Sequence, residues 1–248
     1  MPTLNDRSRD SLESAALGPP SGERTRVRRN LIPLRPLFVG LGAIWLVLIL
    51  ASIAQDGLGL SDTGVGTLFD VDSEKAFYTW YSQLLLSTSG ILLGLIALAR
   101  GDAVRRIRLH WAIFSGLLFF ASLDEAIGIH EHLGMVLHQA LHTRGLFFFP
   151  WTIPYGLAVA AGLFAALPFF RSLPRSVAIR FGVAAGVYLS GAIGCEMIGG
   201  LFMEEGPDYE GGPVLQVIKT TEEALEGLGG LIFLHSLLGY FQDLVAER

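Results

Sequence analysis

The sequence predicts an all-α membrane protein, a polytopic bundle of six transmembrane helices with both termini in the cytoplasm. Hydrophobic residues make up 51% of the 248 residues and charged residues only 17%, whereas a soluble domain carries roughly 25% charged residues. Six apolar stretches can each supply the roughly 20 residues that a spanning helix needs. The positive charges gather in alternate connecting segments, which is typical of a multi-pass membrane protein.

The composition also excludes several other classes of protein. Because Cys195 is the only cysteine, the chain has no intrachain disulfide and no cysteine-rich metal site. The apolar composition argues against a disordered chain and against a nucleic-acid partner. Residues 1–30 are polar and rich in arginine, so we expect a disordered cytoplasmic tail. Residues 31–248 then form the six-helix transmembrane domain.

The predicted spans follow one another along the rest of the chain. They are residues 36–54, residues 77–99, a third that starts at Trp111 and continues past Leu123, residues 147–170, residues 181–203, and a sixth that begins between Val214 and Leu225 and ends near Phe241. Two glycine pairs lie at helical spacing, Gly90 with Gly94 and Gly182 with Gly186. These pairs suit close contact between membrane helices, although general membrane-helix composition explains them equally well.

The arginines predict the orientation of the bundle. Fifteen of the 18 lysines and arginines lie in the tail or just after it at Arg35, in segments 100–108 and 171–180, and at Arg248; the exceptions are Lys75, Arg144 and Lys219. The other connecting segments carry mostly acids. The positive-inside rule therefore predicts cytoplasmic termini, and we expect the protein in a bacterial inner (plasma) membrane.

Ionisable residues inside the spans are the main functional signal. The stretch from Ser122 to His132 closes the third span, Glu196 lies in the fifth, and the stretch from Lys219 to Glu226 opens the sixth. A charge at the centre of a bilayer costs roughly 2.5–3.5 kcal/mol. The charged groups should therefore face one another, a water-filled cavity or a bound cation. They are Asp124, Glu125, His130, Glu131, His132, Glu196, Glu222, Glu223 and Glu226.

Depth along the helices favours convergence of these groups. Counting about 1.5 Å per residue from the cytoplasmic ends places Asp124, Glu125, Glu196 and Glu226 about 20–22 Å into the membrane. The remaining groups form a second layer at about 27–31 Å. In a continuous third helix, Asp124 shares a face with Glu131, and Glu125 shares another with His132. His130 then points elsewhere unless the helix breaks near Gly128.

The balance of charge leads to a metal hypothesis. Seven carboxylates near one lysine cannot all ionise, so either a metal balances them or several hold protons in a hydrogen-bonded network. Carboxylate and imidazole ligands without thiolate suit iron, manganese or zinc. We therefore predict a divalent-metal site. Its ligands come from Asp124, Glu125, Glu131, His132, Glu196, Glu223 and Glu226, with His130 and Glu222 as secondary candidates.

Other residues give weaker signals. The stretch from His130 to Gly134 is no zincin motif, because glycine replaces the second histidine. His138 and His142 fall in the predicted outer loop after the third span. A haem on His110 and His235 is not expected, because a lone histidine on an apolar helix is more often a packing residue. Ser122 hints at a nucleophile, but serine is common in membrane helices.

Three function classes remain open at this stage. The first, which we favour, is a metal-dependent membrane enzyme, an oxidoreductase or a hydrolase, that acts on a lipid or quinone-like substrate. The second is a proton- or cation-coupled transporter, whose acids bind the coupling ion. The third is an accessory structural subunit of a membrane complex, with partner membrane subunits. In each case the lipid bilayer is the first partner.

Overall fold

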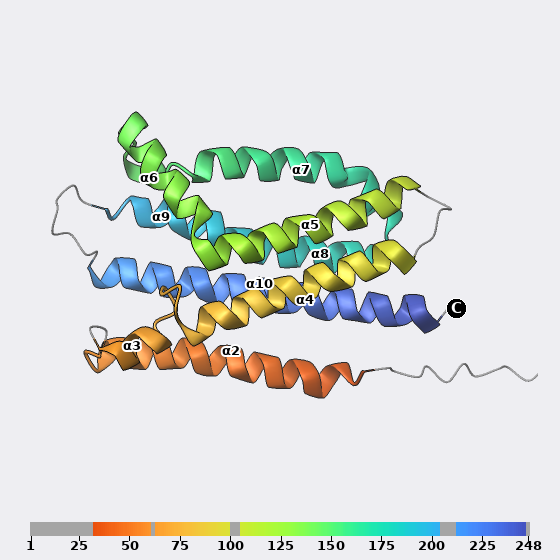
Figure 1. Cartoon of the computed structure of the whole chain (residues 1–248), viewed down its shortest axis with the longest axis horizontal. Coiled ribbons are helices and arrows are strands. Elements are labelled where there is room, and N and C mark those ends of the chain that lie inside the picture. Colours follow the sequence, from red (N-terminus) through yellow and green to blue (C-terminus); the bar gives the residue numbers. More distant parts are fainter. Residues whose placement is uncertain (1–31, 61–62, 100–104, 204–211, 247–248) are drawn as a thin grey trace, which may run out of the picture. The chain divides into compact units, whose positions relative to one another are not determined.

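The computed structural model describes residues 32–60, 63–99, 105–203 and 212–246 (Figure 1). Helix accounts for 86% of these described residues, and none of them forms a strand. The predicted all-helical fold class is therefore confirmed. The predicted tail, residues 1–30, lies outside the described residues.

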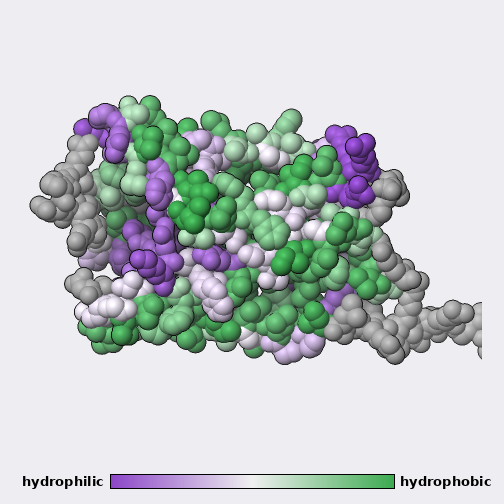
Figure 2. All heavy atoms as spheres, viewed as in Figure 1, coloured by the Kyte–Doolittle hydropathy of each residue, from purple (hydrophilic) through white to green (hydrophobic). Residues whose placement is uncertain are grey.

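Among the described residues, six helices are long and apolar enough to cross a membrane, as predicted. They are α2 (Leu34–Gly57), α4 (Phe77–Ala99), α5 (Arg105–Ile127), α7 (Thr152–Ser172), the α8–α9 unit (Arg175–Gly200) and α10 (Pro213–Ala246). A short helix, α3 (Gly64–Phe69), connects α2 to α4, and a further helix, α6 (Ile129–Leu141), follows α5. Figure 2 shows hydrophobic side chains over much of the bundle, with hydrophilic ones gathered toward its two ends.

The prediction of a third span continuous to His132 is wrong. Helix α5 ends at Ile127, and Gly128 adopts the left-handed conformation with φ +60° before α6 begins. Glycine adopts this conformation readily because it has no Cβ. The shared faces expected of a continuous helix therefore do not exist. His138 lies on α6 and His142 caps its end, so the expected outer loop is a helix.

The later spans also differ from the predicted boundaries. Helix α7 begins only at Thr152, because the preceding aromatic segment forms the short 3₁₀ helix η1 (Gly145–Phe147) and a turn. The fifth span contains a π-helical segment, η2 (Ser190–Cys195), between α8 (Arg175–Leu189) and α9 (Glu196–Gly200). Helix α10 has 34 residues and extends beyond the predicted span at both ends.

Helix α10 is the central element of the bundle. It packs against α2, α4, α8, η2 and α9, while α4 and α5 pair closely beside it (Figure 1). Membrane helices associate through close packing and hydrogen bonds rather than through the hydrophobic effect. The bundle therefore depends on tight contacts at small residues and on aromatic packing.

The two glycine pairs at helical spacing differ in their surroundings. At Gly90 an added Cβ would lie 3.2 Å from the Phe119 ring, and Ser115 on α5 donates a hydrogen bond of 2.7 Å to the Gly90 carbonyl. This pair therefore mediates the α4–α5 contact, and Gly94 has Ser115 Oγ at 3.3 Å from its added Cβ. Gly182 and Gly186 have open space around them in the described structure.

An aromatic core joins the helices at the end of the bundle where α10 terminates. The fully buried Trp111 of α5 packs edge-on against Phe169 of α7 and stacks on Tyr240 of α10, with ring centroids 4.9 and 5.3 Å apart. Phe181 of α8 lies on another side of the same indole. Aromatic pairs of this kind contribute about 0.5–1.5 kcal/mol each beyond area burial. This core holds one end of the bundle while the opposite end opens into a cavity.

Candidate functional site

A cavity of about 670 Å³ lies at the end of the bundle where α10 begins. Its walls come from the segment before α4, from α5, α6, the η1 region, α9 and α10. Eight carboxylate residues line it: Asp72, Glu74, Glu125, Glu131, Glu196, Glu222, Glu223 and Glu226. Lys219, His130 and His138 are the only basic side chains on the described lining. We call this space the acidic cavity.

The structure brings most of the predicted site residues together. Seven line the acidic cavity: Glu125, His130, Glu131, Glu196, Glu222, Glu223 and Glu226. Two predicted ligands, Asp124 and His132, are not on its lining. The His132 ring Nδ1 lies 2.7 Å from the Gly128 carbonyl of the preceding turn, which ties that ring to its own helix end.

Asp124 and His130 form a paired acid and imidazole across the helix break. His130 Nδ1 lies 3.2 Å from Asp124 Oδ2, and the His130 backbone N–H donates to Asp124 Oδ1 at 2.8 Å. The break at Gly128 makes this possible, because it turns the start of α6 back toward the end of α5. Burial lowers the pKa of His130, but the hydrogen bond and negative charge of Asp124 outweigh it and leave that pKa above its ordinary value of 6.5.

The paired imidazole is part of the cavity lining. Among the described residues, His130 Nε2 has no hydrogen-bond partner, while the ring packs against Trp151 with centroids 4.6 Å apart. A carboxylate on one nitrogen fixes the tautomer and the orientation of the ring. The same arrangement serves a general base and a metal-ligating histidine.

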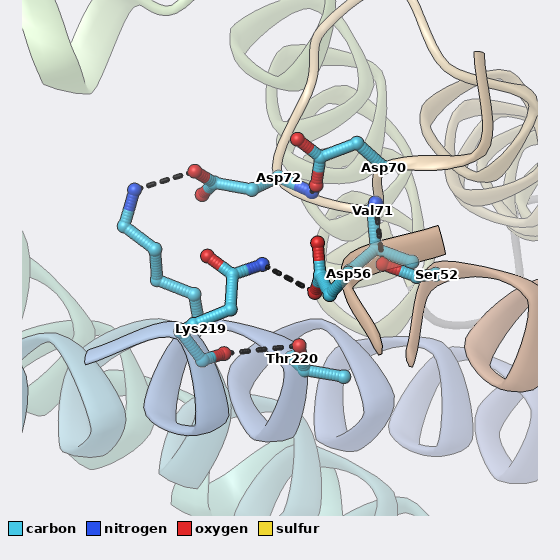
Figure 3. A network of polar contacts seen from close by, with 8 residues as sticks. Ser52, Asp56, Asp70, Val71, Asp72, Lys219 and Thr220 are labelled. Carbon is cyan, nitrogen blue, oxygen red and sulfur yellow. Dashed lines mark hydrogen bonds and ion pairs between the residues drawn. The ribbon is translucent and has the colours of Figure 1, made fainter. Parts of the chain in front are cut away.

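An acidic segment before α4, residues 70–76, closes one side of the cavity. We call it the acidic strap. The Val71 N–H donates to Ser52 Oγ of α2 at 3.2 Å, and Asp72 forms an ion pair with Lys219 of α10 (Figure 3). The Asp72 N–H donates to Asp70 Oδ1 at 3.1 Å. Burial raises the pKa of the Asp70 carboxyl, and the charge of Asp72 adds to this effect.

The acidic strap also changes the balance of charge that the sequence suggests for the cavity. The sequence places Lys219 as the one lysine near the seven carboxylates of the spans. In the structure, Lys219 forms its ion pair with Asp72 of the strap instead. Nearby, the Gln216 side chain of α10 donates to Asp56 at the end of α2 at 3.0 Å. The cation on α10 is therefore engaged by the strap rather than by the carboxylates of the spans.

The acids on α10 lie deeper in the wall. Glu226 is 8% exposed and hydrogen-bonds to the Tyr188 hydroxyl of α8. The Tyr78 hydroxyl of α4 donates a hydrogen bond to the backbone carbonyl of Glu223. This hydroxyl is therefore not a hydrogen-bond donor to the Glu223 carboxylate. In the described structure, Glu223 Oε2 and Glu196 Oε2 are buried without any hydrogen-bond partner. An unsatisfied buried acceptor costs about 1–3 kcal/mol, and more when it is charged.

The π-helical segment η2 positions Glu196 in this wall. An added Cβ at Gly191 would lie 2.7 Å from the Glu222 carbonyl and 3.1 Å from Glu226 Cγ, so η2 lies directly on α10. Single π-helical turns inside α-helices are frequent at functional sites. The extra residue in the turn shifts the register of the helix, and Cys195 and Glu196 both reach the cavity lining.

The carboxylates share a cavity without forming a preassembled metal centre. Within the described ranges, no three His, Cys, Asp or Glu side chains are grouped closely enough to hold one ion. The cavity wall is also partly apolar, with contributions from Met135, Phe148, Phe149, Trp151, Leu215 and Ile218. The lining thus combines a charged side with a hydrophobic one.

Sequence reasoning missed several residues of this site. Asp72 and Glu74 lie in one of the connecting segments that the sequence marks only as acidic, and His138, which is on the lining, falls in the predicted outer loop. No local pattern identifies them, because tertiary packing alone brings the strap and α6 over the cavity. The suggested nucleophile Ser122 is absent from the described lining. It hydrogen-bonds to Ser87 Oγ of α4 at 2.8 Å.

Comparison with known proteins adds one finding. No curated protein and no solved structure gives a significant match to the chain. One family does match residues 34–241, a range that runs from the first residue of α2 into the last turns of α10 and includes every residue lining the acidic cavity. Because the match covers most of the sequence, the chain belongs to the family described as "Domain of unknown function (DUF8692)".

Proposed function

We propose that the acidic cavity binds a divalent cation and that the protein is a metal-dependent membrane enzyme. The observation that carries the proposal is the pair of buried, unpartnered carboxylate oxygens, Glu196 Oε2 and Glu223 Oε2, in the wall of a cavity with an excess of negative charge. Isolated buried carboxylates are strongly disfavoured unless a cation or a proton compensates them. A cation inside the cavity would supply that compensation.

The existing cations are already engaged. Lys219 pairs with Asp72, and His130 pairs with Asp124. Among the described residues, no direct ion pair is formed by the six other lining carboxylates of the spans and of α6: Glu125, Glu131, Glu196, Glu222, Glu223 and Glu226. Like charges gathered in one cavity raise the affinity for a multivalent cation.

The His130 side of the cavity offers the best ligands. Metal-binding histidines usually donate their second ring N–H to a carboxylate, as His130 does to Asp124. Glu125 and Glu131 flank this histidine in the sequence and line the same cavity. Because these ligands are not preassembled, binding requires the glutamate side chains to rotate inward. Iron, manganese and zinc suit such an oxygen and nitrogen ligand set.

The dimensions of the cavity favour an amphipathic substrate. Its volume of about 670 Å³ falls in the range of sites for small organic molecules. The apolar wall suits a lipid or quinone-like molecule, whose polar end would face the carboxylates and His130. A bound metal would supply an activated water for hydrolysis or a redox centre for oxidation, and His130, oriented by Asp124, would be one of its ligands.

The test is a measurement of metal content and melting temperature on full-length protein purified without chelator. If a metal balances the acids, Glu196→Gln lowers metal content and melting temperature together, because a bound ion stabilises the folded state. If the acids only share protons, losing one charge leaves the protein as stable or more stable. Asp243→Asn, far along α10 from the cavity, serves as the matched control and should retain the metal.

The proposal would be overturned if the purified wild type contains no metal and its melting temperature does not change on addition of chelator or of iron, manganese or zinc. Flux driven by an ion gradient in liposomes would then identify a transporter. Absence of flux would favour an accessory subunit of a membrane complex.

We also propose that both termini are cytoplasmic, that the membrane is a bacterial inner membrane and that the acidic cavity opens outward. The support is the arginine content of the opposite end, where segment 171–180 lies, together with the positive-inside rule. In a Cys195→Ala background, Asp70→Cys should react with an impermeant thiol reagent on whole cells, and Arg171→Cys should not. Reaction at Arg171→Cys alone would reverse the orientation.

A further inference from the structure

A second cavity lies between α2, α8 and α10, toward the end of the bundle opposite the acidic cavity. It has a volume of about 410 Å³. Most of its lining is apolar and includes Phe38, Trp45 and Leu46 of α2 and Leu231 of α10. Three polar side chains complete it: Arg180 of α8 and His235 and Ser236 of α10. We call this space the Arg180 groove.

The basic groups of the groove make no hydrogen bond or ion pair with the described residues. Within the described part of the chain, the Arg180 guanidinium takes part in no hydrogen bond or ion pair, and its residue is exposed. The His235 ring makes an edge contact with Phe38 at 4.8 Å between centroids, but no hydrogen bond with a described residue. Ser236 donates to the Ile232 carbonyl of its own helix at 2.9 Å. Among the described residues, the groove therefore offers the Arg180 guanidinium and the His235 ring as free polar groups beside an apolar lining.

Arg180 lies near the start of α8, at the arginine-rich end of the bundle. Arg180 follows the start of α8 at Arg175 by five residues, which is about 8 Å along a helix axis. An arginine at that depth extends its guanidinium to the membrane interface while its stem lies along apolar surface. The apolar side chains of the groove continue from there toward the middle of the membrane, on helices α2 and α10.

The Arg180 guanidinium and the apolar lining beside it suit a molecule that has both an anionic group and a hydrocarbon chain. Guanidinium groups bind phosphate through two parallel hydrogen bonds, and the floor suits an acyl chain. We propose that the Arg180 groove binds one anionic phospholipid of the surrounding bilayer. The phosphate lies on Arg180 and His235, and an acyl chain runs along Phe38, Leu46 and Leu231.

The choice of an anionic lipid rests on charge complementarity. The same end of the bundle carries other arginines from the loops and helix ends: Arg105, Arg106, Arg108, Arg171 and Arg175. Such clusters attract the anionic lipids of the cytoplasmic leaflet. This inference stands independently of the proposed metal site, because the two cavities share no lining residue.

The first test measures retention of lipid by native mass spectrometry on the full chain, released from bilayers of mixed phosphatidylglycerol and phosphatidylcholine. The wild type should retain one phosphatidylglycerol in preference to phosphatidylcholine. Arg180→Gln should weaken that retention about ten-fold, because it removes a charge-assisted bidentate contact. Arg175→Gln removes the same charge from the same helix outside the groove and should leave the retention unchanged.

The second test blocks the groove instead of neutralising it. An added Cβ at Gly42, on the lining, has open space around it, and so has one at Gly40, two residues earlier and off the lining. Gly42→Leu should therefore fold, fill the groove and abolish selective retention, while Gly40→Leu should retain the lipid. Equal retention by both leucine variants, equal loss in both arginine variants, or no preference for phosphatidylglycerol in the wild type would each overturn the proposal.

Discussion

Replacing Gly229 by alanine tests whether the contact between α8 and α10 sets the geometry of the acidic cavity. A Cβ at Gly229 would lie 2.6 Å from the Tyr188 backbone nitrogen and 2.8 Å from its Cα. Ordinary van der Waals contact begins at 3.4 Å, so the two helices must separate by about 0.8 Å. Both sides of this contact are backbone, and no side chain can rotate out of the way.

The magnitude follows from two opposing effects. Overpacking costs about 1–3 kcal/mol, and a contact between two backbones belongs at the upper end of that range. Alanine recovers up to about 1 kcal/mol through its higher helix propensity. We expect a net loss of about 2 kcal/mol, or roughly 4–8 °C in melting temperature for a chain of this size. The displaced α8 also carries Tyr188, the partner of Glu226, so cation affinity should fall as well.

The assay is thermal unfolding in detergent followed by circular dichroism, with and without added manganese. Gly239→Ala on the same helix is the matched control, because its added Cβ meets only Leu34 Cδ1, at 3.8 Å. That variant should be as stable as the wild type or more stable. If Gly229→Ala melts as high as Gly239→Ala, the close contact of α8 with α10 is not what stabilises this wall.

Three further substitutions probe the site. Lys219→Met should strengthen manganese binding measured by calorimetry, yet change the melting temperature by less than about 4 °C, because the side chains of its pair with Asp72 are 35% and 38% exposed and exposed pairs contribute under about 1 kcal/mol. In the presence of chelator, Asp124→Asn should lower the melting temperature more at acidic pH than at alkaline pH. Since the pKa of His130 is raised, the stabilisation is fully present below pH 6.5 and disappears as pH rises through that raised pKa; a loss independent of pH between 5 and 8 contradicts this. Gly128→Ala should lower the melting temperature by several degrees, because φ there is +60° and a left-handed alanine costs about 1–2 kcal/mol; an unchanged melting temperature would show that the α5–α6 break tolerates a side chain.

Hydropathy predicted the spans well because lipid exposure dictates an apolar surface along a whole helix. Helix α4 begins and ends at the predicted residues, Phe77 and Ala99. The outward-facing Leu98 and Phe164 are 80% and 76% exposed in the structure, which suits a surface in contact with lipid. Because helical rise is nearly constant, counting residues along the helices predicted that Glu125, Glu196 and Glu226 approach one another, and all three line the acidic cavity.

The shape of the site depended on features with no local signal. The sequence around Gly128 reads as a continuous helix, since a single glycine interrupts many membrane helices without ending them. In the folded chain the break at Gly128 brings His130 to Asp124, a pairing that no local pattern indicates. Asp72 reaches Lys219 across 147 positions of the sequence, a contact that only the folded bundle creates. Pattern reasoning thus located the acids but missed the strap.

The length of α10 has a thermodynamic consequence. Residues 215–226 of this helix contribute to the acidic cavity and residues 228–236 contribute to the Arg180 groove. A single continuous helix therefore forms part of the wall of both spaces. A ligand in either space that shifts or rotates α10 alters the other space. Thermodynamic linkage requires that each ligand change the binding free energy of the other by the same amount. A measured change in metal affinity upon lipid binding would therefore fix, without a further experiment, the change in lipid affinity upon metal binding.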